Sequence, residues 1–469
     1  MRFIYKFVTS VCMIAIPILA VGQIGIGTQA PDPSAIMDVT SQKQGFLTPR
    51  MTTAQREAIE DPANGLLVFD TDLNSFEYYT TSSTSWGRMS STKRDNYVLV
   101  KSQADFPNPV GNLITLDENT FYEINGTIAL TSSIDLNGAY ISGLDASEDV
   151  LSFPGGTIFK GSGGSIRYVT LTGAKAFEIE GPGIATNSSL LVQNTTISGM
   201  TNSVGTISNL GIFFGNVIQF INNTSGLTYS NIGNLLLNNQ AWFGNNSGTY
   251  EKLEDNFGLV EKVSGFSTVN GSAVGFDVSA NPAVPNGVLL STVFSGSGSY
   301  VNKYTSGSYI GFNFTNDWTI NCPGIPAEDD GTATGNLYYT NSSVVTLSNN
   351  NAIKLPVSTT SIRNFRTSST TSNRLVYEGT KGRSLNIYGT ISFTSIAGMR
   401  VTFSIYKNGN LVPGTEVIYD ITTTNAREGL AIVGTVMVDP SDYVEIYVER
   451  NTSSGSNQFL VTSYNLLVN

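Results

Sequence analysis

Between Asn96 and Thr346 the sequence consists of short apolar pieces such as "YVLV", "NLITL", "FYEI" and "TIAL", separated by Gly, Asn, Ser or Thr. Such pieces cannot form a sheet alone, but at near-regular spacing they can pair with the next coil of a solenoid and fill a narrow core. Asn and Gly suit the corners, because tight corners need positive φ angles. We therefore predict a right-handed parallel β-helix over residues 96–350. A Greek-key sandwich remains the alternative, because no strict repeat is visible.

The composition indicates an all-β protein and excludes several kinds of catalytic chemistry. Charged residues make up 13% of the chain, about half the usual share, and 47 residues are glycine. The absence of histidine removes the commonest general base and zinc ligand. Cys322 is the one cysteine outside the N-terminal leader, so we expect a small buried hydrophobic residue or, as the alternative, an intermolecular bridge.

Residues 1–22 have the pattern of a secretory signal peptide. Arg2 and Lys6 precede an apolar run, and Ala20-Val21-Gly22 is a small-x-small cleavage site, so the mature chain is expected to begin at Gln23. Two of the 25 basic residues lie in this leader, which leaves 23 basic against 36 acidic residues and a net charge of −13. We expect an extracellular protein, at a cell or virion surface, that binds no nucleic acid and is not inserted in a membrane after cleavage.

Residues 23–89 form a separate N-terminal module, followed by a polar linker at residues 90–95. The module contains, in order, "IGIGT", "PDPSAIMDV", "GFLTPRMTTAQREAI", "GLLVFDTD", "FEYY" and "SW". Thr52 or Thr53 can cap a short helix, and two strands are predicted to meet at residues 72–74. This order resembles a module that precedes β-rich fibre, adhesin or tail-type regions in secreted and phage-derived proteins of Bacteroidetes. The resemblance implies attachment in a fibre, tailspike or surface context and implies no reaction.

Residues 351–469 contain longer alternating strands, which predict a jelly-roll sandwich. Asn408-Gly409 is a strong signal for a type I′ hairpin. The region resembles C-terminal domains of phage fibre proteins and, more loosely, tumour-necrosis-factor-like jelly rolls. That resemblance implies a homotrimer held by apolar side chains of "DYVEIYVER" and "SYNLLVN", with a monomer as the alternative. Within the predicted solenoid region, the charged segment at residues 245–266 is expected to be a short amphipathic helix or an extended loop over the solenoid, with a merely solvated face as the alternative.

Carboxylates are the only credible catalytic material. Glu178 and Glu180 are two apart on a predicted strand and should project to one face, and Asp329 and Asp330 form a second cluster. Glycoside hydrolysis needs one acid of raised pKa beside an ionised partner, but neither cluster lies in a catalytic motif, and solvated surface is the competing interpretation. Asp329 and Asp330 are also calcium candidates, although no Asp-x-Asp-x-Asp-Gly loop is present, and we expect no cofactor.

Aromatic faces can stack on sugar rings, so four residues are candidate glycan contacts: Trp242, Trp318, Tyr338 and Tyr339. Core packing is the alternative for each tryptophan. The leading hypothesis is a non-enzymatic structural or adhesive protein of phage tail-fibre, tailspike or virion-surface type, in contact with surface glycans or other structural proteins. The alternatives are a secreted polysaccharide lyase or glycoside hydrolase on a β-helix scaffold and a bacterial cell-surface adhesin.

Overall fold

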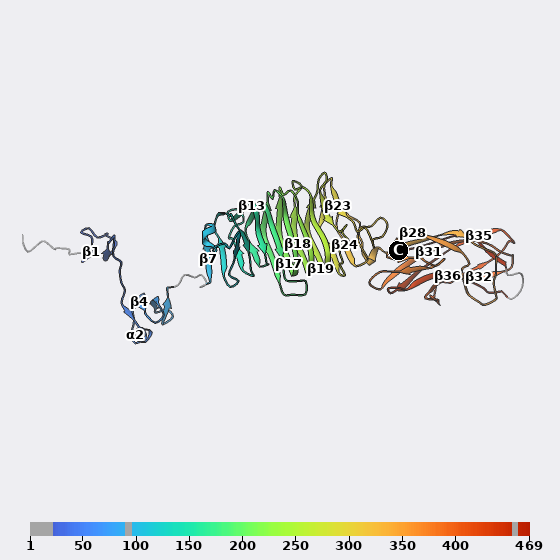
Figure 1. Cartoon of the computed structure of the whole chain (residues 1–469). Coiled ribbons are helices and arrows are strands. Elements are labelled where there is room, and N and C mark those ends of the chain that lie inside the picture. Colours follow the sequence, from blue (N-terminus) through green and yellow to red (C-terminus); the bar gives the residue numbers. More distant parts are fainter. Residues whose placement is uncertain (1–21, 90–95, 453–457) are drawn as a thin grey trace, which may run out of the picture. The chain divides into compact units, whose positions relative to one another are not determined.

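A computed structural model describes residues 22–89, 96–452 and 458–469. The predicted signal peptide, apart from Gly22, and the predicted linker lie outside these residues. The chain divides into two compact units, residues 1–95 and residues 96–469. Nearly all regular structure in the described residues is β (Figure 1). Within the described residues, no helix is long and apolar enough to span a membrane.

The N-terminal unit contains two small sheets. Strands β1 (Ile24–Ile26) and β2 (Met37–Val39) form a parallel pair. The second sheet has the order β3-β4-β5-β6 and carries one short helix. Its elements are β3 (Arg50–Met51), α2 (Thr53–Glu57), β4 (Leu67–Asp70), β5 (Ser75–Thr80) and β6 (Ser85–Arg88). The helix and the β4–β5 hairpin lie where the sequence predicts them, because local capping and turn signals specify both.

Residues 97–321 form a parallel β-solenoid, which confirms the predicted solenoid fold (Figure 1). Each strand pairs in parallel with strands of the next coil. A short η1 helix (Gln103–Asp105) follows the first strand. The strands are β7 (Tyr97–Val100), β8 (Leu113–Thr115), β9 (Phe121–Ile124), β10 (Thr127–Ala129), β11 (Ser133–Asp135), β12 (Tyr140–Ser142), β13 (Val150–Gly161), β14 (Ser165–Arg167), β15 (Thr170–Glu180), β16 (Ser189–Ser198), β17 (Ser203–Ile221), β18 (Leu227–Trp242), β19 (Thr249–Thr268), β20 (Val274–Asp277), β21 (Gly287–Leu290), β22 (Val293–Ser295), β23 (Ser299–Asn302) and β24 (Trp318–Asn321).

Inward side chains stack from coil to coil and fill the solenoid core. One inner column runs through Leu151, Leu171, Ile197, Phe220 and Trp242, all of them buried. Because each coil covers the apolar face of the one before it, strands too short to be stable alone bury a continuous core. Burial of this apolar surface is the main stabilising term of the solenoid.

Buried asparagines satisfy the backbone at one corner of the solenoid. The Asn223 side-chain amide donates to the Ile197 carbonyl oxygen and to Asn246 Oδ1, both at 3.0 Å. The Asn246 amide donates in turn to the carbonyl oxygens of Phe220 and Phe243, at 2.6 and 2.8 Å. The Asn246 amide is a second donor to the Phe220 and Phe243 carbonyl oxygens, which also accept the Phe243 and Asn246 N–H groups, and the asparagines thereby link successive coils at this corner.

The charged segment at residues 245–266 is not a helix or a covering loop, so that prediction is wrong. It forms most of β19, which pairs along its length with β18. Lys252 and Glu254 lie on the outside, but Glu251 and Lys262 point into the core, where their side chains are 0% and 1% exposed. Lys262 Nζ lies 3.0 Å from Glu251 Oε1. The two charges neutralise each other, which lets charged residues occupy an interior position.

The C-terminal part of the second unit contains two antiparallel sheets around one apolar core. One sheet has the order β28-β25-β37-β31-β35 with β26 on β37, and the other has the order β29-β30-β36-β32-β33 with β27 on β36 and β34 on β32. The strands are β25 (Thr334–Asn341), β26 (Val345–Thr346), β27 (Ile353–Lys354), β28 (Ser358–Phe365), β29 (Thr367–Ser368), β30 (Leu375–Tyr377), β31 (Arg383–Thr394), β32 (Arg400–Lys407), β33 (Asn410–Leu411), β34 (Val417–Asp420), β35 (Arg427–Val438), β36 (Tyr443–Arg450) and β37 (Gln458–Val468).

The sandwich begins earlier than the predicted boundary at residues 350/351. Strand β25 pairs with β28 and β37, so the sandwich starts at Thr334, after a short η2 helix (Asp330–Thr332). The boundary was misplaced because β25 has the same apolar and Asn/Thr-rich composition as a solenoid strand. The predicted hairpin is present: Asn408 and Gly409 have φ angles of 51° and 76°, as a type I′ turn requires.

Candidate functional site

Glu178 and Glu180, predicted to share an exposed face, have separate partners at the end of β15. Glu178 pairs with Lys160 Nζ at 3.2 Å and Lys175 Nζ at 3.8 Å, and Glu180 accepts a hydrogen bond from Asn209. Partial burial would raise the pKa of Glu178, but the hydrogen bond and charge of Lys160, with the charge of Lys175, lower it below its ordinary value. A glycosidase acid needs a raised pKa, so Glu178 is a poor candidate for that role.

Asp329 and Asp330 lie between the solenoid and the sandwich rather than at an exposed corner. Asp330 pairs with Arg366 and accepts hydrogen bonds from the backbone N–H groups of Thr380 and Lys381, at 3.1 and 2.9 Å. Burial raises the pKa of Asp330, but the hydrogen bonds and Arg366 lower it overall. Donors of the chain itself occupy this carboxylate, which argues against the predicted catalytic and calcium-binding roles.

Arg366 is the centre of this junction. Its buried guanidinium donates to the carbonyl oxygens of Trp318 and Glu328 and pairs with Asp330. The buried Glu328 carboxylate accepts a hydrogen bond from the Phe314 N–H at 2.9 Å, and desolvation raises the pKa of Glu328. These contacts join the last solenoid strand to the first sandwich strands, so the site is structural.

The predicted glycan-binding aromatic residues divide into buried and exposed ones. Trp242 and Trp318 are buried in the solenoid core, and Trp242 stacks on Tyr250 with ring centroids 4.5 Å apart. Neither tryptophan presents a face to a sugar, so that prediction is wrong for both. On β25, Tyr338 is exposed, whereas Tyr339 packs partly buried against the sandwich core. Tyr338 therefore remains a predicted glycan contact, and Tyr339 offers less surface.

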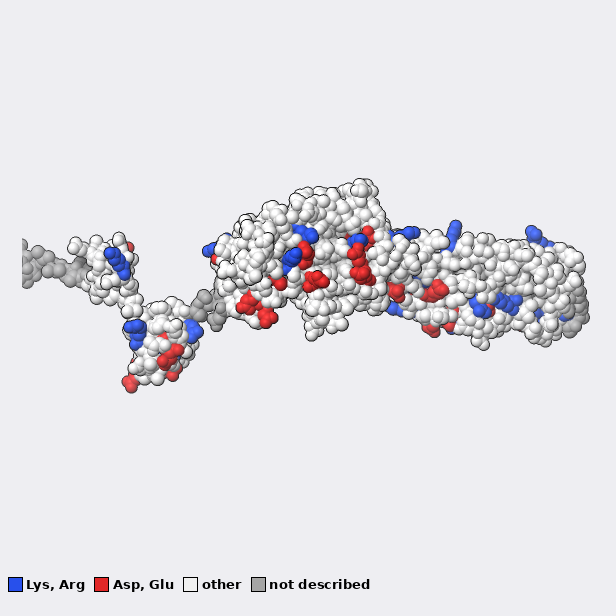
Figure 2. All heavy atoms as spheres, in the orientation of Figure 1, with Lys and Arg blue, Asp and Glu red and all other residues white. Residues whose placement is uncertain are grey.

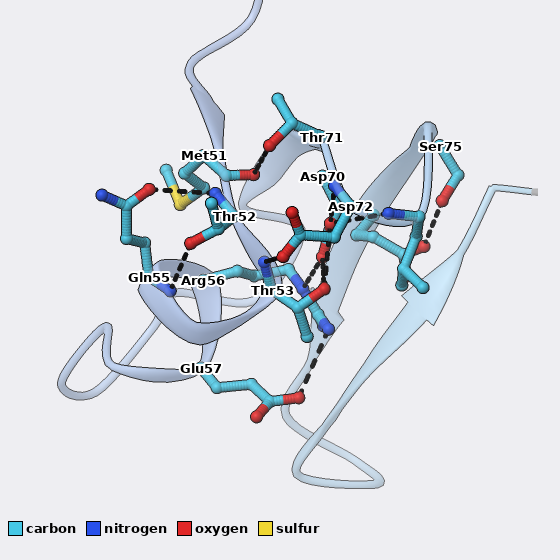
Figure 3. Close-up of polar contacts among 12 residues, drawn as sticks. Met51, Thr52, Thr53, Gln55, Arg56, Glu57, Asp70, Thr71, Asp72 and Ser75 are labelled. Atoms are coloured by element: carbon cyan, nitrogen blue, oxygen red, sulfur yellow. Dashed lines mark hydrogen bonds and ion pairs between the residues drawn. The ribbon is translucent and has the colours of Figure 1, made fainter.

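In the N-terminal unit, α2 begins with a reciprocal cap (Figure 3). The Gln55 N–H donates to Thr52 Oγ1 at 3.3 Å, and the Thr52 N–H donates to Gln55 Oε1 at 2.9 Å. Such a capping box satisfies two backbone donors that a helix start leaves free. It explains why this five-residue helix forms in a chain otherwise made of strands.

Asp70, at the end of β4, ties the helix to the sheet (Figure 3). Its carboxylate accepts hydrogen bonds from Arg56 Nε and Thr53 Oγ1, each at 2.9 Å, and from the Leu73 N–H at 3.1 Å. Desolvation raises the pKa of Asp70, but these hydrogen bonds outweigh it and lower the pKa overall. Arg56 also lies over the Trp86 ring, 5.3 Å from its centroid. The network thus joins α2, β4 and β6 within this small module.

The N-terminal unit leaves much apolar surface uncovered. Every residue of β1 is exposed, and seven large apolar side chains before β3 are between 43% and 79% exposed. These are Ile24, Ile26, Ile36, Met37, Val39, Phe46 and Leu47. An isolated two-stranded sheet is marginal in water, and apolar surface of this extent indicates contact with another surface. The sequence analysis did not single out these residues. The signal that could have found them is that the apolar strands of this region are too short to bury their own side chains.

The sandwich corrects the predicted location of the trimer contacts. Most apolar side chains of "DYVEIYVER" and "SYNLLVN" lie in the core of a single sandwich, whereas Leu467 lies on its outer face. The buried residues are Val444, Ile446, Val448, Tyr464, Leu466 and Val468. The outer face of the first sheet carries a different row, in which Ile362, Asn336, Leu467, Tyr388 and Val433 are neighbours across five strands. No member of this row is charged.

Comparison with known proteins gives one family match. Residues 25–104 match the family model described as the phage tail like trimerisation region. The match covers the N-terminal unit, including its exposed apolar strands, and ends just beyond the first solenoid strand. No curated protein sequence matches the chain.

Solved structures with some similarity include bacteriophage tailspike proteins and murine APRIL. The enzymatically active domain of tailspike protein 4 of bacteriophage CBA120 is 10% identical; the match covers 90% of this chain and 77% of that one and has a TM-score of 0.16. Full-length tailspike protein 2 from an Escherichia coli O157:H7 bacteriophage is 11% identical; the match covers 89% of this chain and 80% of that one and has a TM-score of 0.22. Murine APRIL at pH 5.0 is 10% identical, covers 29% and 97%, and has a TM-score of 0.22. Likenesses this weak say nothing about what this chain binds or cleaves. The family match alone shows that the chain resembles proteins of the phage tail-fibre and tailspike type.

Proposed function

We propose that this protein is a homotrimeric structural or adhesive component of a phage tail fibre, tailspike or virion surface. The observation that carries the proposal is the trimerisation-region match over residues 25–104, which coincides with the uncovered apolar strands β1 and β2. Three copies around one axis would cover these strands and remove their exposed edges. Extracellular or virion-surface exposure and contact with surface glycans belong to the same proposal, with Tyr338 as the candidate contact.

The C-terminal sandwich would contribute through the outer face of its first sheet. We assign a jelly-roll topology to the sandwich, because neighbouring strands such as β37-β31-β35 and β30-β36-β32 come from distant parts of the chain. The uncharged row from Ile362 to Val433 supplies the apolar surface that permanent interfaces bury. Leu467 is the one member of this row that lies in the originally predicted contact segments; the buried side chains of those segments lie inside one sandwich.

Light scattering on the full chain tests the trimer. Ile24 and Met37 are register partners in the β1–β2 pair, so the double variant Ile24→Asp, Met37→Asp should shift the mass from trimer toward monomer. Gln29→Asp, at an exposed polar position of the same unit, is the matched control and should remain trimeric. A wild-type chain that is monomeric at micromolar concentration would overturn the proposal.

The absence of enzymatic activity is also part of the proposal. It is supported by the lowered pKa values of Glu178 and Asp330, which do not suit a general acid near neutral pH. The test is reducing-sugar release from a panel of capsular and algal glycans. Turnover that is abolished by Glu178→Gln would establish the polysaccharide lyase or hydrolase alternative.

A further inference from the structure

Successive coils stack equivalent positions into outward-facing columns that run along the solenoid. One column contains Lys160, Glu178, Thr206, Thr228 and Lys252, as the strand registers show. Its members are charged residues or small hydroxyl residues. Charged side chains gather in patches on the solenoid instead of covering it evenly (Figure 2). This surface is well suited to water and offers little to an apolar partner.

A second face carries a threonine-rich column. Thr127, Val150, Thr170, Thr196 and Gln219 follow one another in register. Hydroxyl and amide groups dominate this column up to Gln219, and the register then continues through Ala241, Phe266 and Val293, so its last part is apolar.

The third face differs, because one of its two outward columns is mostly apolar. The neighbouring column on the same strands is polar and holds Glu123, Ser142, Arg167, Gln193, Asn216 and Asn238. Starting at Tyr97, the register leads through Phe121, Tyr140, Ser165, Leu191, Phe214 and Leu236, and then reaches the exposed Glu261. Six of these residues, Tyr97, Phe121, Tyr140, Leu191, Phe214 and Leu236, are here called the apolar column. Tyr140 is 39% exposed, and the other five are partly exposed. At about 4.8 Å per coil, the column is roughly 30 Å long.

A hollow interrupts the apolar column at Ser165. Its volume is about 350 Å³, and its lining includes Tyr140, Ser165 and Leu191. Ser165 is 2% exposed, and its hydroxyl oxygen has no hydrogen-bond partner among the described residues. Buried polar groups are normally satisfied, so a group from outside this chain or a trapped water is expected to complete the site.

We propose that the apolar column is the surface along which three copies of this chain pack, with their solenoids parallel. This inference rests on the proposed homotrimer and names the part of the solenoid that faces the three-fold axis. The family match to a trimerisation region runs to residue 104 and so includes Tyr97, the first member of the column. The column therefore continues, along the chain, the region matched to trimerisation.

Symmetry selects this column over the charged column, and it has more apolar members than the threonine-rich column. An axis parallel to the solenoids brings the same level of each copy together, so a residue on the inner face meets its own equivalents. Contact between equivalent apolar side chains buries apolar surface and is favourable. Contact between equivalent copies of Lys160, Glu178 or Lys252 would instead bring like charges together. The apolar contact would end at Glu261, because the carboxylates of three copies repel one another at that level. The hollows at Ser165 would meet at one level and enclose water that reaches each Ser165 hydroxyl.

Crosslinking of the full chain tests this arrangement. Phe214 and Thr206 both lie on β17 but in different columns, so Phe214→Cys and Thr206→Cys are a matched pair. With a short bismaleimide, Phe214→Cys should give covalently joined chains, and Thr206→Cys should give only the wild-type background. The wild-type chain, treated in the same way, measures any crosslinking through the buried Cys322. Leu236→Cys, one coil further along the apolar column, provides a second site if the first variant does not fold.

A trimer in which neither Phe214→Cys nor Leu236→Cys crosslinks would overturn the apolar column as the interface and leave the homotrimer intact. Equal crosslinking of Thr206→Cys would also overturn it. A monomeric wild type would overturn the proposed function, and this inference with it. As a second measurement, Phe214→Glu with Leu236→Glu should dissociate or loosen the trimer, whereas Thr206→Glu with Thr228→Glu should leave it intact. Unchanged circular dichroism would show that both double variants remain folded.

Discussion

Replacing Lys262 by methionine should destabilise the solenoid around β19 by about 3 kcal/mol near pH 7. The variant would leave the buried Glu251 carboxylate without its partner, and such a group takes up a proton rather than remain charged. A carboxyl of this kind ordinarily titrates at 4.5. Protonating it near pH 7 costs about 1.4 kcal/mol for each of roughly 2.5 pH units, or about 3.4 kcal/mol in total. This agrees with the cost of about 3–5 kcal/mol for breaking a buried pair.

The loss of stability in Lys262→Met should depend on pH, and the pKa of Glu251 decides the direction. Burial raises the pKa of Glu251 even beside Lys262, and removing Lys262 raises it further. A group whose folded pKa lies above its unfolded value stabilises the fold below the unfolded pKa and loses that contribution as pH rises through the folded pKa. The variant should therefore differ little from wild type near pH 4.5 and become progressively less stable as the pH rises to 7.

Hydrogen–deuterium exchange of peptides from β18 and β19 measures this local stability. Near pH 7, Lys262→Met should exchange about 300-fold faster than wild type there, which is 3.4 kcal/mol expressed as a ratio. Lys252→Met removes the exposed Lys252–Glu254 pair on the same strand and should change exchange less than about fivefold. The double variant Glu251→Gln, Lys262→Met buries no charge and should recover most of the protection. The reasoning would be refuted if β18 and β19 in Lys262→Met were as protected from exchange as in wild type, or if the loss of protection did not grow as the pH rises.

Three further predictions follow from the buried polar contacts. Asn246→Ala leaves the buried Asn223 backbone N–H, which donates to Asn246 Oδ1 at 2.8 Å, without that acceptor and should cost about 1–3 kcal/mol by hydrogen exchange; the exposed neighbour Asn245→Ala should cost less than about 0.5 kcal/mol, and equal losses would contradict this. Arg366→Gln breaks the junction and should split one calorimetric transition of residues 96–469 into two; a single unchanged transition would show that Arg366 is dispensable. The pKa of Asp70 is lowered, so its contribution to the stability of the N-terminal unit is present above pH 3.8 and is lost as the pH falls through the folded pKa. Pepsin should therefore cleave the wild-type N-terminal unit readily only near pH 2, but should cleave the Asp70→Asn variant already near pH 5. Equal resistance of the two proteins to pepsin near pH 5 would count against the network.

The sequence by itself determined the features that depend on local geometry. Short apolar strands with Gly and Asn corners were enough to predict a parallel solenoid, because each strand needs only a similar strand on the next coil. The Asn408-Gly409 hairpin and the cap at Thr52 were also predictable, since a turn type or a helix start depends on a few adjacent residues. The N-terminal module could be recognised from the order of its motifs, which the family match bears out.

Only the tertiary structure decided which side chains meet across coils. Register partners are 19 residues apart from Phe121 to Tyr140 but 26 apart from Ser165 to Leu191. Coils of unequal length hide any repeat, so the apolar column cannot be read from spacing. The same irregularity placed Glu251 and Lys262 inside the core, although their charges suggested the outside. Burial of a side chain depends on what the neighbouring coil brings opposite it, and that partner lies about 20 residues or more away in the chain.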